Sequence, residues 1–218
     1  MNRKKDLAFR YLLFLVGLFI ASLGVAFSAK AGLGTSPVAS VPYSVSLISS
    51  RLTFGGRMNL WSVIQISIQV LLLRKRCKPV EIIIQTILAF VYGYMTDFSC
   101  MLLGGINPTN YIMQFVLMLV GCVVLAFGIW IQFKGGVAML SGEAMNRAIS
   151  TVTGRKYENV KITFDIIYIL VAVVICYFGL GKLVGVREGS VIAAILVGNI
   201  IKFYNMVYDI LKKQLSGR

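Results

Sequence analysis

Hydrophobic residues gather in six long runs along the chain, separated by short polar segments. Each run holds about 20 mostly apolar residues, the length that a helix needs to cross a bilayer core. The predicted membrane-spanning helices are Leu7–Ala29, Met58–Leu73, Val80–Leu103, Tyr111–Phe133, Val160–Leu180 and Gly189–Leu211. The second is short and carries Asn59, Gln65 and Gln69, which predicts a face turned toward protein or water rather than lipid. The pattern predicts an all-α polytopic membrane protein.

The order of small and charged residues predicts an internal repeat. Three residues near the end of the first span recur 104 positions later: Gly24, Lys30 and Gly32 match Gly128, Lys134 and Gly136. The third and sixth spans match with an offset of 105: Ala89, Gly93, Asp97 and Phe98 match Ala194, Gly198, Lys202 and Phe203. Three spans per half is an odd number, so residues 109–218 would form an inverted copy of residues 1–108, as in many secondary transporters. The small residues of the third and sixth spans predict that these two helices cross at Gly93 and Gly198.

A short polar segment follows the first span of each half and predicts a short helix. In the first half, Gly32 and Gly34 break the span, Thr35 or Ser36 can cap, and a helix begins within residues 35–50. In the second half the segment is Ser141–Thr153, where Ser141 or Gly142 can cap. Each helix start could hold an anion or a polar solute group. Both segments are compatible with a re-entrant helix and with an interfacial helix.

The candidate substrate-binding residues come from these two segments: Gly32, Gly34, Thr35, Ser36, Ser141, Gly142, Glu143, Asn146 and Arg147. Charged residues inside predicted spans are the candidates for coupling or gating, because charge is costly in a membrane: Lys161, Asp165, Asp97 and Lys202. Simpler explanations remain open for each of the four. Lys161 and Asp165 are spaced for a local ion pair, Lys202 could reach the interface, and Asp97 could be solvated.

Composition supports a membrane protein and explains the net charge. Hydrophobic residues make up 58% of the 218 residues and charged residues 14%, which excludes soluble and disordered chains. The net charge is +14, from 22 basic and 8 acidic residues. Sixteen of the basic residues fall in the regions that are inside when the N-terminus is cytoplasmic, and five fall outside. This bias predicts that both termini are cytoplasmic, and it makes nucleic acid an unsuitable partner.

Catalysis is the least favoured function class. The chain has no histidine, and its four cysteines share no metal-binding or redox spacing. No nucleophile triad or metal site can be assembled from the remaining residues. We therefore expect no enzyme activity, no cofactor and no metal site.

Four stretches of the sequence resemble the YczE/YyaS/YitT group of bacterial integral membrane proteins. These stretches are Gly32–Pro37, Glu143–Arg147, Val160–Lys161 with Asp165, and Gly185–Ser190 followed by Ala193–Gly198. Two features depart from the group: Glu stands at 143 in place of the commoner Asp, and the usual Gly-Pro-Arg form before it is missing. The resemblance spans about Tyr11 to Tyr204 and implies a multi-pass protein of the bacterial plasma membrane, commonly regarded as a transporter.

The expected function is transport of a small anionic or zwitterionic solute, bound between the two short helix N-termini near the membrane midplane. Two other functions remain open: a solute-binding subunit of an energy-coupled uptake complex, and a non-transporting scaffold or accessory protein. The expected partners are the small-molecule solute and membrane lipids. A homodimer is compatible with the sequence.

Overall fold

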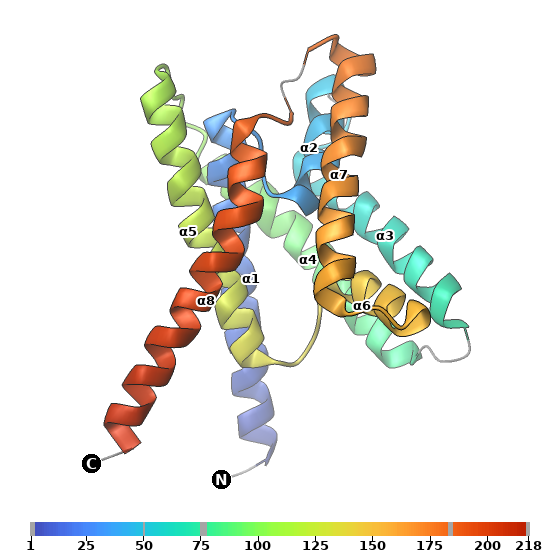
Figure 1. Ribbon diagram of the computed structural model, residues 1–218, viewed down its shortest axis with the longest axis vertical. Helices are drawn as coiled ribbons and strands as arrows, with labels where there is room; N and C mark the ends of the chain where they lie inside the picture. Colours follow the sequence, from blue (N-terminus) through green and yellow to red (C-terminus); the bar gives the residue numbers. More distant parts are fainter. Residues whose placement is uncertain (1–2, 50, 75–77, 183–184, 217–218) are drawn as a thin grey trace.

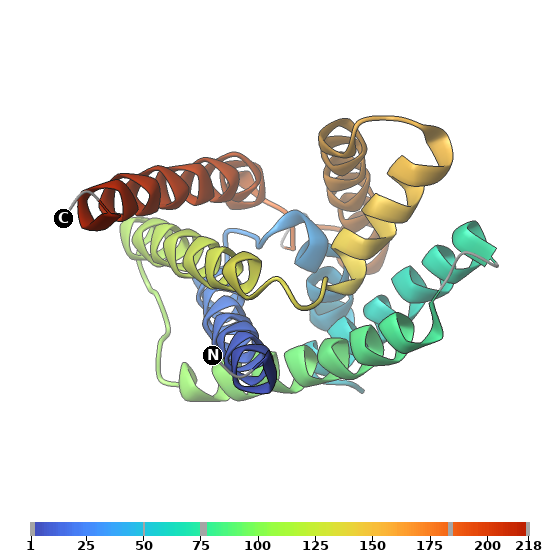
Figure 2. The same ribbon diagram turned by 90° about the horizontal axis from the view of Figure 1, so that it is seen from below.

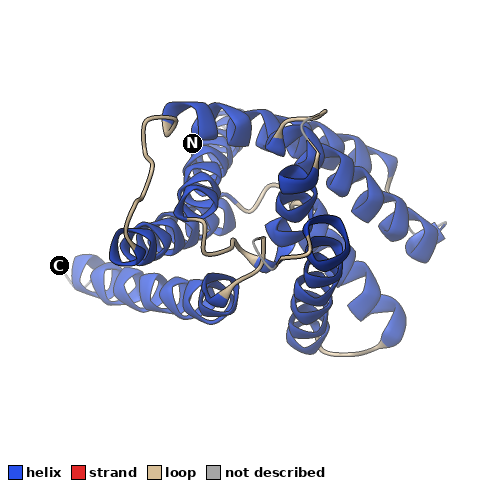
Figure 3. Cartoon of the chain, turned by 90° about the horizontal axis from the view of Figure 1, so that it is seen from above, coloured by secondary structure: helices blue, strands red, loops and turns tan. Residues whose placement is uncertain are grey.

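The computed structural model describes residues 3–49, 51–74, 78–182 and 185–216. Their secondary structure is helical, apart from one isolated bridge between Gly34 and Val186 (Figure 3). The helices are α1 (Arg3–Ala31), α2 (Pro37–Ile48), α3 (Phe54–Leu73), α4 (Pro79–Leu102), α5 (Tyr111–Gly135), α6 (Ser141–Thr153), α7 (Tyr157–Leu180) and α8 (Glu188–Ser216). The start of α1 and the end of α8 lie at the same end of the molecule (Figure 1).

Five of these helices are long and apolar enough to cross a membrane: α1, α4, α5, α7 and α8. The helix in the region of the predicted second span, α3, is not among them. Its polar side chains Asn59, Gln65 and Gln69 are buried, whereas Leu60 and Leu71 are exposed. The prediction that this helix turns its polar face toward protein or water rather than lipid is confirmed, and the structure shows that protein covers it.

The two short helices predicted from the polar segments are present as α2 and α6. Pro37 is the first residue of α2, and Ser36 is its N-cap, but the Ser36 side chain makes no capping hydrogen bond. The prediction that Ser141 or Gly142 caps the second short helix is wrong, because Leu140 is the N-cap and the helix begins at Ser141. The Ser141 hydroxyl is instead used by another helix, as described below.

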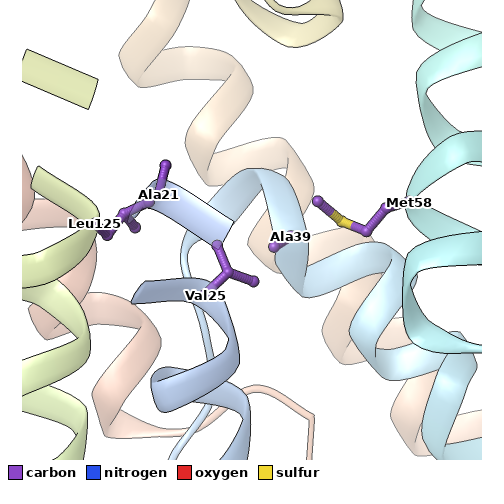
Figure 4. Close-up of a cluster of buried hydrophobic side chains, with 5 residues drawn as sticks. All are labelled: Ala21, Val25, Ala39, Met58 and Leu125. Carbon is purple, nitrogen blue, oxygen red and sulfur yellow. The ribbon is translucent and has the colours of Figure 1, made fainter. Parts of the chain in front are cut away.

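The centre of the molecule is the crossing of α1 with α5, which pack along most of their lengths in opposite directions. Small residues bring the two backbones close together. A Cβ at Gly17 would touch Gly128 and Gln132, and a Cβ at Gly121 would touch Gly24 and Ser28. Leu125 of α5 packs on Ala21 and Val25 of α1, in a cluster that reaches Ala39 of α2 and Met58 of α3 (Figure 4).

Each of these central helices has a parallel neighbour. Phe14 and Leu18 of α1 cluster with Leu88 of α4, and further along the Ser22 and Ser99 hydroxyls lie 2.9 Å apart. The contacts move toward the C-terminal end of both helices together, so α1 and α4 are parallel. In the same way α5 and α8 are parallel, with Tyr111 bonded to Glu188 at one end and Trp130 bonded to Asn205 further along.

The remaining helices pack around this pair. The contacts are α2 with α3 and α7, and α6 with α3 and α7. α3 packs closely on α4, because Gly93 leaves room for Asn59 and for the backbone of Gly55. The prediction that the third and sixth spans cross at Gly93 and Gly198 is wrong. Gly93 contacts α3, whereas a Cβ at Gly198 would meet no atom of another described element within 4 Å.

Candidate functional site

The first turns of α2 and α6 meet at one cavity, which has a volume of about 370 Å³. Val38 in the first turn of α2 faces Gly142 in the first turn of α6, where a Cβ would lie 3.3 Å from a methyl group of Val38. Ser36 and Glu143 also line the cavity. The two short helices therefore begin at a shared space between the longer helices.

A chain of hydrogen bonds fixes the start of α6 to two neighbouring helices. The Ser141 hydroxyl donates to Oε1 of Gln65 in α3 at 2.9 Å. Nε2 of Gln65 donates in turn to the Tyr168 hydroxyl of α7 at 3.2 Å. The Trp61 ring lies edge-on to the Tyr168 ring, with their centroids 5.8 Å apart. Hydrogen bonds among three helices therefore position this polar side of the cavity.

Three ionisable carboxylate and ammonium groups line the cavity. Lys161 donates to Oδ2 of Asp165 at 3.2 Å, which is the i,i+4 ion pair that the spacing allows. The Glu143 carboxylate makes no hydrogen bond or ion pair with any described residue. Burial raises the pKa of Glu143, and the positive charge of Lys161 partly opposes this rise. When all three groups are charged, the cavity carries one net negative charge.

Three buried polar atoms on the cavity lining lack a partner within the described part of the chain: Trp61 Nε1, Asn146 Oδ1 and Asp165 Oδ1. Asn146 is only 1% exposed, so bulk water does not satisfy it. Buried polar groups in proteins are nearly always hydrogen-bonded, and an unpaired one is costly. They place one unpaired donor and two unpaired acceptors within the polar wall of the cavity.

The opposite side of the cavity is apolar. It is formed by α5 and α8, and Gln132 is its one polar residue. The residues that line it are Leu125, Ile129, Gln132 and Phe133 of α5, and Ala193, Ala194, Val197, Gly198 and Ile201 of α8. Polar and apolar groups are therefore separated onto two walls.

A second cavity of about 670 Å³ lies between α3, α4, α5 and α6. Gln132 and Phe133 line both cavities, so they form the partition between them. Arg147 is exposed and lines this second cavity, where it lies 3.5 Å from the sulfur of Met139. Gln69 Oε1 of α3 and Gln85 Nε2 of α4 have no partner among the described residues.

The predicted site residues fall into two groups in the structure. The first cavity is lined by Ser36, Ser141, Gly142, Glu143, Asn146, Lys161 and Asp165. The other predicted residues lie elsewhere. Gly32 and Gly34 have positive φ angles of 70° and 100°, and Gly34 packs on Ser190. Thr35 is buried beside them.

Two predicted coupling residues also lie away from the cavity. Asp97 of α4 lies beside the start of α3. Its Oδ1 accepts a hydrogen bond from the Gly55 amide and its Oδ2 accepts one from the Thr53 hydroxyl, both at 2.6 Å. Lys202 is exposed on α8, beside the cavity residue Ile201. Neither side chain contributes to the lining.

The sequence did not identify the aromatic residues that line the cavity, which are Trp61, Tyr92, Phe133 and Tyr157. An aromatic ring inside a hydrophobic run carries no local signal that separates a cavity wall from a packed core. Gln65 did carry such a signal, because an amide in a membrane span needs a partner. Among the described residues, no three His, Cys, Asp or Glu side chains are grouped to hold a metal ion.

The sequence profile of one family matches this chain over residues 8–206: the family of unknown function DUF6198. The match covers most of the chain, which therefore belongs to this family. Its description does not carry the YczE/YyaS/YitT name. No curated protein and no solved structure matches the chain.

Proposed function

We propose that this member of the DUF6198 family is a small membrane transporter and that its solute binds in the 370 Å³ cavity. One observation carries the proposal. Two short helices that are not among the apolar, span-length helices begin at the same cavity, and residues that carry unpartnered polar atoms line it. Irregular backbone at membrane depth is tolerated where it lines such a cavity, and transporters build binding sites in this way.

The proposal includes two inverted repeats, and the contacts of α1 with α5 support this. Gly17 faces Gly128 and Gln132. An offset of 104 positions relates these residues to Gly121, Gly24 and Ser28. Gly121 does face Gly24 and Ser28 in the structure, so the same contact occurs twice. The packing of whole helices is repeated in the same way. The contact of α1 with α4 corresponds to that of α5 with α8, and the contact of α2 with α7 corresponds to that of α6 with α3.

The proposal also includes six membrane crossings, with α3 as the sixth. Because α1 and α4 are parallel, the chain must return across the membrane between them. α3 has 20 residues, which is about 30 Å of helix and matches the thickness of the bilayer core. Its polar face is buried in the protein, which explains its low hydropathy.

Charge on the cavity wall favours a solute with an ammonium group over a simple anion. Glu143 is the carboxylate without a partner, whereas Lys161 is already paired with Asp165. A zwitterion remains compatible, because the uncapped start of α2 could hold its carboxylate. We propose that Asp165 and Glu143 couple the solute to protons and that no cofactor or catalysis is involved.

The motif resemblance and the charge bias complete the proposal. They favour a relative of the YczE/YyaS/YitT group in a bacterial plasma membrane, with both termini cytoplasmic. The parallel pairs α1–α4 and α5–α8 agree with both termini on one side. A homodimer remains compatible with the exposed apolar helices.

The direct test is counterflow into proteoliposomes with radiolabelled glycine, betaine and choline, at several pH gradients. We expect uptake that Asn146→Leu abolishes and that Asp209→Asn, an exposed carboxylate on α8, leaves unchanged. Binding without flux would instead favour a solute-capturing subunit. Neither binding nor flux for any probe would contradict the proposal and favour a scaffold.

A further inference from the structure

The two hairpins α3–α4 and α7–α8 differ in how closely their helices pack. α3 and α4 are in close contact at Gly93, where any side chain would collide with Asn59. In the described residues, α7 and α8 do not pack along their lengths, and the ribbons diverge (Figures 1 and 2). Gly198, which matches Gly93 in the repeat, has no atom from another described element within 4 Å of its Cβ position. One hairpin is closed and the other is open.

The open hairpin connects the cavity to the outside of the protein at membrane depth. Ala194 and Gly198 lie one helical turn apart, line the cavity and are also exposed. Gly198 lies ten residues, or about 15 Å, from the start of α8, near the middle of its apolar stretch. Both α7 and α8 are long and apolar enough to span the membrane, so the opening between them faces lipid chains rather than water.

The cavity behind this opening separates polar from apolar groups. Its α5–α8 wall carries hydrocarbon side chains apart from Gln132, and its α3–α6–α7 wall carries Glu143, Asn146 and Trp61. Asn146 and Trp61 each hold a polar atom without a partner among the described residues. An occupant that satisfies both walls has a polar head and an apolar body. The carboxylate without a partner, together with the aromatic rings of Trp61 and Tyr92, suits a positively charged head.

We infer that the ligand of this cavity is an amphiphile with an ammonium head and a hydrocarbon tail, which passes between α7 and α8 directly from the bilayer. The inference rests on the proposed function, because it identifies the solute class of the same cavity. The head lies against Glu143, and the tail lies along α5 and α8 toward Gly198. Two sources share this chemistry: a free amphiphile dissolved in the membrane, and a bilayer lipid with a trimethylammonium headgroup.

Trp61 offers a direct reporter of occupancy. The chain has two tryptophans, so Trp130→Phe leaves the cavity indole as the one fluorophore of this kind. Bromine quenches indole fluorescence at short range. In nanodiscs of a neutral glycolipid, which offers no ammonium group to compete, we expect (4-bromoundecyl)trimethylammonium, with its bromine near the head, to quench Trp61 saturably. 4-Bromoundecanoate, which has the opposite charge, should require at least about tenfold more probe, as should the cation with Glu143→Gln.

The opening is tested by filling it. Gly198→Phe places a ring where the structure leaves space, and Ile195→Phe is the matched control on the exposed face of α8. Gly198→Phe should weaken quenching by the long-chain cation at least about tenfold and retain quenching by the water-soluble (4-bromobutyl)trimethylammonium. Ile195→Phe should change neither. Retained quenching by the short probe shows that the cavity is still folded.

Other outcomes overturn the inference or identify the source. Equal quenching by the cationic and the anionic probe would contradict the inference. Equal quenching by the long-chain cation in Gly198→Phe and Ile195→Phe would contradict it as well. Saturable quenching of Trp61 by brominated phosphatidylcholine, lost with Gly198→Phe, supports it with bilayer lipid as the source; quenching by the free cation alone supports it with a dissolved amphiphile. Saturable quenching without flux would contradict transport and leave this inference standing. Flux of a polar solute without quenching would support transport and contradict this inference.

Discussion

Ser141, the first residue of α6, donates a 2.9 Å hydrogen bond from its hydroxyl to Oε1 of Gln65 in the middle of α3. Gln65 continues the chain by donating to the Tyr168 hydroxyl. All three side chains are buried, where each polar group needs a partner. The wall of the cavity is therefore set by one amide that joins three helices.

Replacing that amide should loosen the cavity wall. Gln65→Leu leaves the Ser141 and Tyr168 hydroxyls without Gln65 as a partner, at a cost of about 1–3 kcal/mol. We expect a lower Tm in detergent and weaker ligand binding. Ser67→Ala is the control, because Ser67 is exposed on the same helix and bonds to a carbonyl of its own turn. An unchanged Tm for Gln65→Leu would contradict the assigned role.

The crossing of α1 with α5 should tolerate no added carbon. Gly128→Ala places a methyl group against the backbone of Ala21, which forces the helices apart and should cost about 1–3 kcal/mol or more. Gly198→Ala is the matched control, because its methyl group meets open space and alanine favours a helix by about 0.5–1 kcal/mol. We expect a marked loss of Tm for the first and none for the second. Equal effects would show that the crossing is not tightly packed.

The elements of this fold could be predicted from sequence because their signals are local. Apolar runs, glycine breaks and Pro37 predicted the helices, and α6 ends at Thr153, the last residue of the predicted segment. The pairing of helices could not be predicted in the same way. Gly93 and Gly198 read alike in sequence, yet one is packed against Asn59 and the other faces a cavity. The difference depends on the position of α7, which no local pattern encodes.

The candidate site was predictable in its polar half only. Seven of the thirteen predicted residues line the cavity, because caps, carboxylates and amides are unusual in a membrane span and attract notice. Asp97 is an equally unusual carboxylate in a predicted span, but it accepts a hydrogen bond from the backbone at the start of α3. The apolar wall could not be predicted from the sequence, because residues such as Val197 and Leu125 also occur on helix faces that pack against other helices.

Asp97 should matter for folding and not for ligand binding. Asp97→Ala removes the acceptors of the Gly55 amide and the Thr53 hydroxyl at the start of α3, with an expected cost of about 1–2 kcal/mol. Thermal unfolding should show this loss, and Asp209→Ala, an exposed carboxylate on α8, should show none. Ligand affinity of the folded Asp97→Ala protein should match the wild type. A loss of affinity at unchanged Tm would place Asp97 in the binding machinery instead.

The six-crossing topology predicts that the two ends of α3 lie on opposite sides of the membrane. Single cysteines at Leu52 and Lys78, both exposed, can be introduced after the native Cys77, Cys100, Cys122 and Cys176 are replaced by serine. In intact cells, a membrane-impermeant maleimide should label Leu52→Cys. Lys78→Cys should react only after the cells are permeabilised. Labelling of both from one side would mean that α3 does not cross.

Glu143 should make ligand binding depend on pH. Burial raises the pKa of this carboxyl, so it holds its proton at pH values where an exposed glutamate is already ionised. Because the protonated form is favoured in the folded protein, the Glu143 contribution to stability falls as pH rises through this window. Affinity for an ammonium ligand should rise over the same window, as the carboxylate forms beside Lys161, Asp165, Tyr157 and Tyr92. Glu143→Gln should bind more weakly and with a flat profile from pH 5 to pH 8, measured by Trp61 quenching. A slope that survives in Glu143→Gln would assign the titration to Asp165, and Asp165→Asn would then remove it.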